Sequence, residues 1–227
     1  MTRARLDPDA IYTLTFDCYG TLIDWEGGVR AAAEGIASLR DADLARLVRD
    51  RERIERELER GPYRPYREVL AASVVAAARE QGLVVAADEA RAFAESQAAW
   101  PPFEESRAVL ARLAERWQLA ILSNVENAVL AASARALAAP FELFVSAEDV
   151  RSYKPAPAHF EAALAQLGIE RQQVLHVACS LYHDVRPALA LGLRTAWVNR
   201  AGEELPEGIA PDLVVPDLTT LAGALGA

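Results

Sequence analysis

The spacing of apolar positions divides this chain into two kinds of sequence. Between residues 29 and 98 apolar side chains recur at helical intervals, and no stretch there reads as a convincing strand. From Pro101 onward, helical stretches alternate with short apolar runs. These runs lie at residues 119–124, 142–147, 174–180 and 194–200. Such alternation predicts right-handed crossovers between parallel strands, with helices on both faces of one sheet.

An earlier apolar run, at residues 11–16, belongs to the same predicted sheet. The helical segment follows this run directly, so it is an insertion after the first strand. We therefore predict an α/β fold, with a doubly wound, Rossmann-like parallel sheet core and an inserted α-helical cap domain. The predicted core comprises residues 9–23 and 99–227, and the predicted cap comprises residues 24–98.

The ends of the predicted strands carry polar side chains. Asp17 ends the first strand, and a carboxylate in that position is costly unless the fold supplies partners. Taken singly, the others have simpler explanations as helix caps or solvated surface charges. Ligands bind at the carboxyl ends of parallel strands, so together these side chains predict a functional site. They are Ser123 and Asn124, then Lys154, and finally Ser180 and Asp184.

Composition and charge narrow the range of partners. The formal net charge of -9 excludes nucleic acid and an anionic membrane as expected partners, but it permits a small anionic substrate held by local cations. The N-terminal stretch MTRARLDPDA has no apolar core, which predicts a cytoplasmic protein. Two cysteines, Cys18 and Cys179, are too few for a disulfide framework, and we interpret them as small core residues rather than redox groups.

Four motifs in this order resemble the haloacid dehalogenase superfamily of hydrolases. They are "DCYGTL", "LSN", "YKPAPAHF" and "HDVRPALALGLRTAWVNR". Phosphatases of that superfamily carry a second aspartate in the first motif, which protonates a departing alkoxide, whereas this chain has Tyr19. A halide needs no such acid, so the chain is similar to the L-2-haloacid dehalogenase branch. His183 and Asp184 replace a pair of acids, and we predict no metal and no cofactor.

The resemblance implies a role for each motif residue. Asp17 is the expected nucleophile, forming an ester that water hydrolyses to a 2-hydroxy acid with inversion. Lys154 is expected to keep Asp17 ionised, and Asp184 to orient Lys154. The remaining predicted catalytic residues are Thr21 and Ser123, and the predicted substrate-binding residues are Tyr19, Asn124, Ser180 and Arg49.

The cap is expected to contribute a cation for the small anionic organic acid. Arg49, Arg51 and Arg53 lie at about the right distance after Asp17, and we selected Arg49. Each of them also suits a solvated helix face beside glutamates such as Glu52. The resemblance and the alanine-rich cap further suggest a homodimer.

Several positions depart from the branch and keep other functions open. Phe160 stands where the dehalogenases have a tyrosine, and "CSLYHD" stands where they have "SSNxxD". One alternative is a related hydrolase acting on another small C2-substituted acid, such as azetidine-2-carboxylate. Another is a small-molecule phosphatase with His183 as its acid, and a third is a non-catalytic binding protein.

Overall fold

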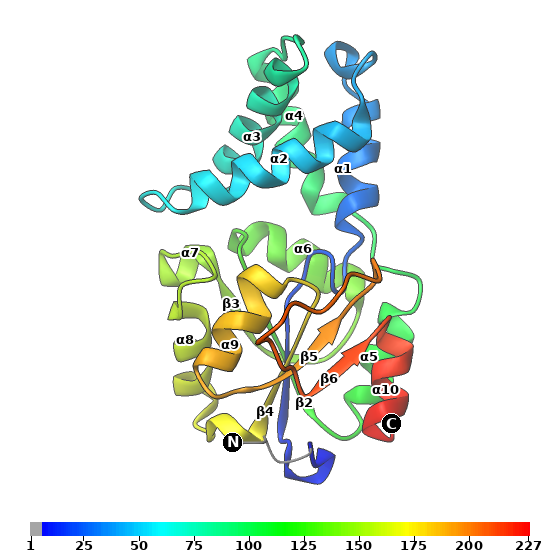
Figure 1. Cartoon of the computed structure of the whole chain (residues 1–227), viewed down its shortest axis with the longest axis vertical. Coiled ribbons are helices and arrows are strands. Elements are labelled where there is room, and N and C mark those ends of the chain that lie inside the picture. The colour runs from blue at the N-terminus through cyan, green and yellow to red at the C-terminus, as the bar shows by residue number, and fades with distance from the viewer. Residues whose placement is uncertain (1–5) are drawn as a thin grey trace.

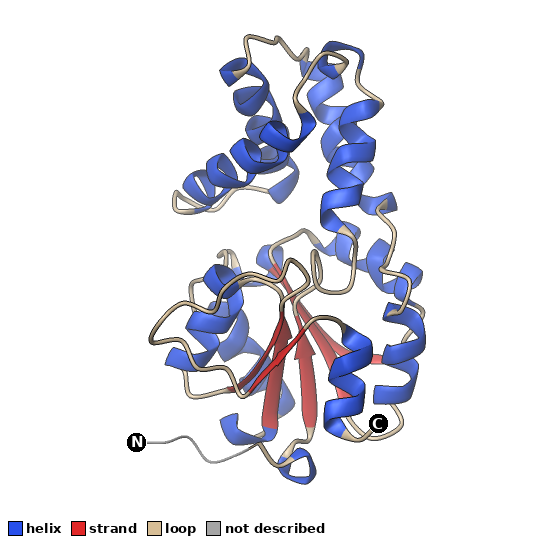
Figure 2. Cartoon of the chain, turned by 45° about the vertical axis from the view of Figure 1, so that its right-hand side comes forward, coloured by secondary structure: helices blue, strands red, loops and turns tan. Residues whose placement is uncertain are grey.

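A parallel sheet of six strands lies at the centre of the computed structural model, which describes residues 6–227 (Figures 1 and 2). The strand order is β3-β2-β1-β4-β5-β6, and every neighbouring pair is parallel. The strands are β1 (Thr13–Phe16), β2 (Gln118–Ser123), β3 (Phe141–Ser146), β4 (Val174–Ala178), β5 (Arg194–Val198) and β6 (Leu213–Val215). The predicted fold class is therefore confirmed.

Strand β1 lies in the interior of the sheet, between β2 and β4. Its residues pair with β2 on one side and β4 on the other, with Thr15 opposite both Ala120 and His176. All four residues of β1 are buried, as expected for a strand covered on both faces. The chain order reverses at this strand, so Asp17 emerges at the switch point where open parallel sheets bind ligands.

Helices cover both faces of the sheet. In Figure 1, α8 and α9 lie to the left of the strands and α5 and α10 to the right. The helices of this part are α5 (Ser106–Leu113), α6 (Asn127–Leu137), α7 (Ala147–Val150), α8 (Ala158–Leu167), α9 (Arg186–Ala190) and α10 (Leu218–Leu225). Three short turns complete it: η1 (Pro8–Ala10), η4 (Arg171–Gln173) and the π-helical turn η5 (Leu181–Val185).

The segment predicted as a cap forms a helical layer beyond the carboxyl ends of the strands (Figures 1 and 2). It contains α1 (Trp25–Glu34), η2 (Ala37–Leu39), α2 (Leu44–Glu59), α3 (Tyr66–Glu80), α4 (Ala87–Glu95) and η3 (Ser96–Ala99). The carboxylates of Asp24 and Asp43 cap α1 and α2 by accepting from backbone N–H groups. Helix α2 ends at Glu59, just before Gly61 and Pro62 break it. The exact domain boundaries stay a prediction.

The predicted cytoplasmic location of the protein was based partly on its N-terminal stretch. Residues 1–5 of the N-terminal stretch lie outside the described residues. Within residues 6–227, none of the helices combines the length and hydrophobicity that crossing a membrane requires. A cytoplasmic location stays a prediction.

Candidate active site

Lys154, the only lysine of the chain, connects the two buried aspartates at the edge of the sheet. Its Nζ donates to Asp17 Oδ1 at 2.9 Å, to Asp184 Oδ1 at 2.6 Å and to the Leu122 carbonyl at 2.9 Å. All three ammonium hydrogens therefore have acceptors, although the side chain is only 1% exposed. The structure brings together residues from three separate strand ends, as the sequence predicted.

Charge and burial act against each other in this group. Burial lowers the pKa of Lys154, but the carboxylates of Asp17 and Asp184 outweigh it and raise the pKa above the ordinary value. Burial raises the pKa of Asp17, and the Lys154 ammonium opposes that rise. For Asp184 burial also favours the neutral form, yet Lys154 and then His176 hold its pKa well below the usual range. Lys154 is thus the group that compensates two buried negative charges.

The turn after β1 holds the second oxygen of Asp17. Thr21 Oγ1 donates to Asp17 Oδ2 at 2.7 Å and accepts from the Cys179 backbone N–H at 2.9 Å. Gly20 has φ +87°, and a Cβ there would come within 2.8 Å of Cys179 Sγ. Both carboxylate oxygens of Asp17 therefore have donors in a turn that requires its glycine.

Asp184 lies inside the π-helical turn η5 rather than at the first residue of a regular helix. His176 Nε2 lies 3.0 Å from Asp184 Oδ1, and His176 Nδ1 lies 2.9 Å from Thr15 Oγ1. Since a carboxylate only accepts, Nε2 carries a proton and donates it to Asp184, while Nδ1 shares a hydrogen bond with the threonine hydroxyl. Asp184 Oδ2 has no hydrogen-bond partner among the described residues. This oxygen is buried.

His176 is a residue that the sequence reasoning missed. A histidine within an apolar strand run was the available signal, since a buried imidazole needs hydrogen-bond partners. The edge of Phe160 packs on its ring, with centroids 5.0 Å apart. Phe160, noted for lacking a hydroxyl, therefore supports the histidine that holds Asp184.

The second strand end positions the lysine loop. The Lys154 backbone N–H donates to Asn124 Oδ1 at 2.7 Å, and Asn124 Nδ2 donates back to the Lys154 carbonyl at 3.1 Å. Ser123 is buried, and its carbonyl lies 3.2 Å from His159 Nε2. Asn124 is thus engaged with protein, while it also lines the cavity described next.

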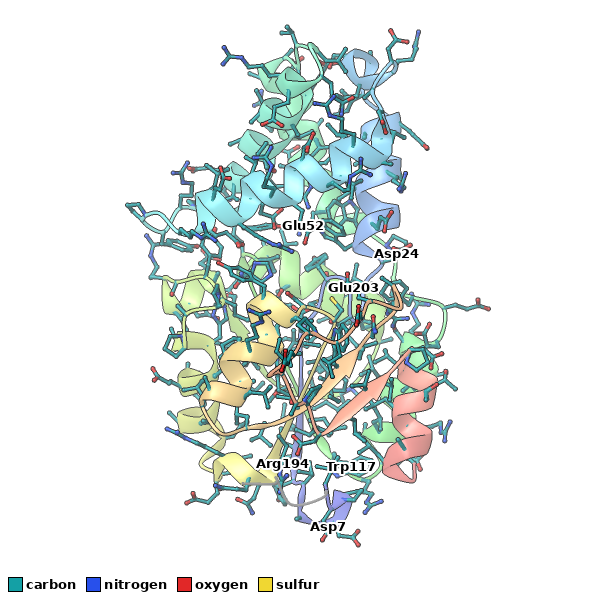
Figure 3. All side chains as sticks on the ribbon, in the orientation of Figure 1. Asp7, Asp24, Glu52, Trp117, Arg194 and Glu203 are labelled. Carbon is teal, nitrogen blue, oxygen red and sulfur yellow. The ribbon has the colours of Figure 1, made fainter. Side chains whose placement is uncertain are left out.

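A cavity of about 730 Å³ opens above these residues, between the sheet and the cap helices. Its lining includes the predicted residues Asp17, Tyr19, Ser123, Asn124, Lys154, Ser180 and Asp184. Thr21 reaches the site through its hydrogen bond to Asp17. Asp24, Glu52 and Glu203, labelled in Figure 3, lie around the same space. Among the lining residues, carboxylates outnumber the cationic side chains.

Tyr19 does not replace the missing acid of the first motif. Its hydroxyl lies 2.7 Å from Ser133 Oγ on α6, and its ring packs edge-on against Trp100. Burial raises the pKa of Tyr19 further above its ordinary value. Tyr19 therefore shapes the wall of the cavity and gives up no proton near neutral pH.

The structure does not place Arg49 in the lining of this cavity, and its role in substrate binding stays a prediction. Helix α2 presents Glu52, Glu55, Arg56 and Glu59 to the cavity at spacings of three and four residues. Arg49 lies a turn before this stripe, is exposed to solvent and does not line the cavity. Arg49 shares the helix face of Glu52 and Arg56, so its distance along α2 keeps it out of the cavity, and the sequence pattern left open which turn of the helix lies over the site.

The other two cap arginines do not line the cavity either. Arg51 is buried beside Trp25, with its guanidinium 4.9 Å from the ring centroid, and it forms an ion pair with Glu55. Arg53 is exposed and pairs with Glu80 at 2.7 Å. The arginine of α2 that does line the cavity is Arg56, which is paired with Glu52.

Glu59 connects the cap to the core at the wall of the cavity. Its Oε2 lies 3.1 Å from His183 Nε2, and its Oε1 accepts from Asn124 Nδ2 at 3.2 Å. Burial raises the pKa of Glu59, and His183 opposes that rise. Burial lowers the pKa of His183, but the hydrogen bond that its ring donates to Glu59 and the negative charge of Glu59 outweigh burial and raise the pKa. His183 is thus held by the cap rather than left free as an acid.

Both cysteines are free thiols, as predicted. Burial raises the pKa of each thiol, so neither ionises readily near neutral pH. Among residues 6–227, no group of three or more His, Cys, Asp or Glu side chains is placed to hold a metal ion. The predicted absence of a metal or cofactor stays a prediction.

A six-stranded parallel sheet with a polar cavity at its carboxyl edge defines an α/β enzyme. The chain belongs to the haloacid dehalogenase-like hydrolases, whose family model matches residues 11–192. It is 30% identical to haloacetate dehalogenase H-2 of Moraxella sp. (strain B) over 213 residues, which are 91% of this chain and 94% of that protein. It is 29% identical to (S)-2-haloacid dehalogenase of Pseudomonas sp. (strain YL), with 92% of each chain covered.

A solved structure extends the similarity to three dimensions. A crystal structure of an L-2-haloacid dehalogenase superposes with a TM-score of 0.84 at 26% identity. The match covers 96% of this chain and 99% of that chain. Both the sheet and the helical layer beyond it are therefore included in the similarity.

Proposed function

We propose that this protein is an (S)-2-haloacid dehalogenase that hydrolyses the carbon–halogen bond of short 2-halocarboxylates. One observation supports this best: the Lys154 ammonium joins Asp17 to Asp184, while Tyr19 stands where a phosphatase has its acid. The first-motif position that would protonate a leaving group thus holds a phenol bonded to Ser133 instead of a carboxylic acid. A halide leaves as a stable anion and needs none. The names of the relatives agree with this proposal.

The first step is attack by Asp17. A carboxylate oxygen of Asp17 bonds to C2 of the substrate on the side opposite the halogen. The carbon–halogen bond breaks, its electron pair leaves with the halide, and the configuration at C2 inverts. Lys154 and Thr21 hold the carboxylate ionised and aligned during this approach.

The second step is hydrolysis of the ester. Water attacks the Asp17 carbonyl carbon, and the Lys154 ammonium stabilises the oxyanion that develops. Asp184 orients the Lys154 ammonium for this step. One water hydrogen stays with the released 2-hydroxy acid, the other leaves as a proton, and Asp17 regains its carboxylate.

Chloride release tests the proposal directly. Wild type is incubated with L-2-chloropropionate and with chloroacetate in the presence of a chelator, beside Asp17→Asn. Release by wild type that survives the chelator and is absent from the variant supports the proposal. No release from either acid contradicts it. Light scattering on the same preparation tests the expected homodimer, and fractionation of cells tests the expected cytoplasmic location.

A further inference from the structure

A second cavity of about 310 Å³ adjoins the active-site cavity. The two share Arg56, Glu59 and Tyr182 as a common wall. The smaller cavity is also lined by Tyr153 and Pro155, the residues on either side of Lys154. It therefore lies next to the catalytic lysine, at the edge where the end of α2 meets the core.

The charge of this second cavity differs from that of the first. It is lined by Arg56, Arg60 and Arg151, and Glu59 is its single carboxylate. Glu59 is already bonded to the core side chains of His183 and Asn124. Within residues 6–227, neither Arg60 nor Arg151 forms an ion pair with a carboxylate. In a chain of net charge -9, such a cavity favours an anion.

Most cationic side chains that line the larger cavity already form ion pairs with carboxylates of the protein. Lys154 is bonded to both aspartates, Arg56 is paired with Glu52, and Arg200 is paired with Glu105 at 2.7 Å. Arg186 lines it too, from an exposed position. The carboxylates around that space disfavour a second negative group. An additional anionic group on a ligand is accommodated better in the smaller cavity.

Aromatic rings hold two of the arginines in place. The Arg151 guanidinium lies 4.2 Å from the Tyr63 ring centroid, and the Arg56 guanidinium lies 5.4 Å from that of Tyr182. Tyr63 in turn packs on the buried Tyr153, with ring centroids 5.5 Å apart. Stacking occupies a face of the guanidinium and leaves the N–H edges of Arg151 for carboxylate or phosphate oxygens, whereas Arg56 already donates to Glu52.

The backbone at Arg151 is also constrained. Arg151 has φ +51°, a left-handed conformation that is uncommon for residues other than glycine. Arg151 adopts it as the C-cap of α7, with its backbone N–H donating to the Ala147 carbonyl. The contact with Tyr63 is what holds its guanidinium at this cavity.

We propose that the smaller cavity, with Arg60 and Arg151 as its cations without a carboxylate partner among residues 6–227, is an anion subsite for the far end of the substrate. The best substrates then carry a second anionic group, a carboxylate or a phosphate, beyond the carbon that Asp17 attacks. This inference rests on the proposed function for the reacting end. It adds a substrate class, that of 2-halo acids with two negative ends.

Matched substrates test the inference. Chloride release is measured from 2-chlorosuccinate, 2-chloroglutarate and 2-chloroadipate, each beside its ester methylated at the far carboxylate. We expect kcat/KM for the best diacid to exceed that of its ester by about tenfold, the value of one charge-assisted contact. The doubly substituted Arg60→Gln, Arg151→Gln enzyme should lose this preference, whereas Arg49→Gln, an exposed arginine outside both cavities, should keep it. Equal rates for diacid and ester, or a preference that survives the double substitution, would overturn the inference.

A binding measurement separates this inference from the dehalogenase proposal. Glutarate, butyrate and inorganic phosphate are titrated calorimetrically into wild type and the double variant. Tighter binding of glutarate than butyrate, weakened about tenfold in the double variant, supports the subsite even if no chloride is released from any acid. Binding of phosphate alone, with no advantage for glutarate, would assign the cavity to a free anion and overturn the second-group inference. No difference between the two proteins would overturn it as well.

Discussion

The two sides of the active-site cavity differ in how completely their polar groups are satisfied. On the core side, Lys154, Asp17 and Asp184 bond to one another and to further buried partners, with one aspartate oxygen left over. On the cap side, Glu52 and Arg56 are half-exposed and pair with each other. The core-side residues are thus held in one arrangement by buried hydrogen bonds, whereas the half-exposed cap-side residues can be substituted with less effect on the structure. This contrast predicts that substitutions on the two sides have very different consequences.

The largest effect is expected at the centre of the core side. Lys154→Gln removes the charge that offsets two buried carboxylates and stabilises the oxyanion, so kcat/KM should fall by about 100-fold to 1,000-fold. Chloride release measures the loss, and circular dichroism establishes whether the variant is folded. A folded variant with nearly wild-type turnover would contradict the central role of Lys154.

A smaller effect is expected from the residue that supports Asp184. His176→Phe removes the donor to Asp184 Oδ1, and we expect kcat to fall about tenfold, the value of one hydrogen bond to a charged group. Selective nitrogen-15 labelling of the only lysine provides a second measurement, because the single Nζ resonance should move when Asp184 shifts. His176→Gln, which keeps a donor, should restore part of the activity. Unchanged kcat with an unmoved Nζ resonance would show that His176 only fills space.

These core-side residues show how much the sequence could predict. The hydrophobic runs of the strands are easily recognised in the sequence, and parallel strands bring their carboxyl ends to one edge of the sheet. Four of the predicted residues lie at or after such strand ends: Asp17, Ser123, Lys154 and Asp184. The fold class followed from the same pattern. His176 was missed because its role depends on register, which places it opposite Thr15 and within reach of Asp184.

The cap side was predicted less well for a physical reason. The helices themselves followed from the spacing of apolar residues and from the breakers at Gly61 and Pro62. The turn of α2 that lies over the site was not determined, because charged residues occupy nearly all of the surface positions along the helix. Arg49 was therefore chosen where the structure presents Glu52, Arg56 and Glu59.

A change in the pKa of His183 is expected when its contact with Glu59, between the core and the cap, is removed. Glu59 raises the pKa of His183, so Glu59→Gln should lower it, as followed by the histidine ring resonances. The raised pKa also makes the stability of the fold depend on pH. The stabilisation from protonated His183 is fully present below the ordinary pKa of 6.5, and it is lost as pH rises through the raised pKa. His159, whose pKa burial lowers to about 3, should stay neutral and serve as the internal control. A His183 pKa that is the same in both proteins would contradict the Glu59 contact.

The smallest effect is expected at the exposed arginine first chosen for the substrate. Arg49→Gln should leave kcat/KM for L-2-chloropropionate within about twofold of wild type, because the side chain is solvated and outside the cavity. A loss of tenfold or more in a folded protein would return Arg49 to the site and would require α2 to shift during turnover.

The account depends above all on Asp17 as a nucleophile, and isotope labelling tests that role most directly. Wild type in excess over L-2-chloropropionate is allowed one turnover in oxygen-18 water, and the peptide containing Asp17 is then weighed by mass spectrometry. Water that attacks an aspartyl ester leaves its oxygen in Asp17, so the account predicts a labelled peptide and an unlabelled first molecule of lactate. Labelled lactate with an unlabelled peptide would mean that water attacks C2 directly, and it would contradict the account.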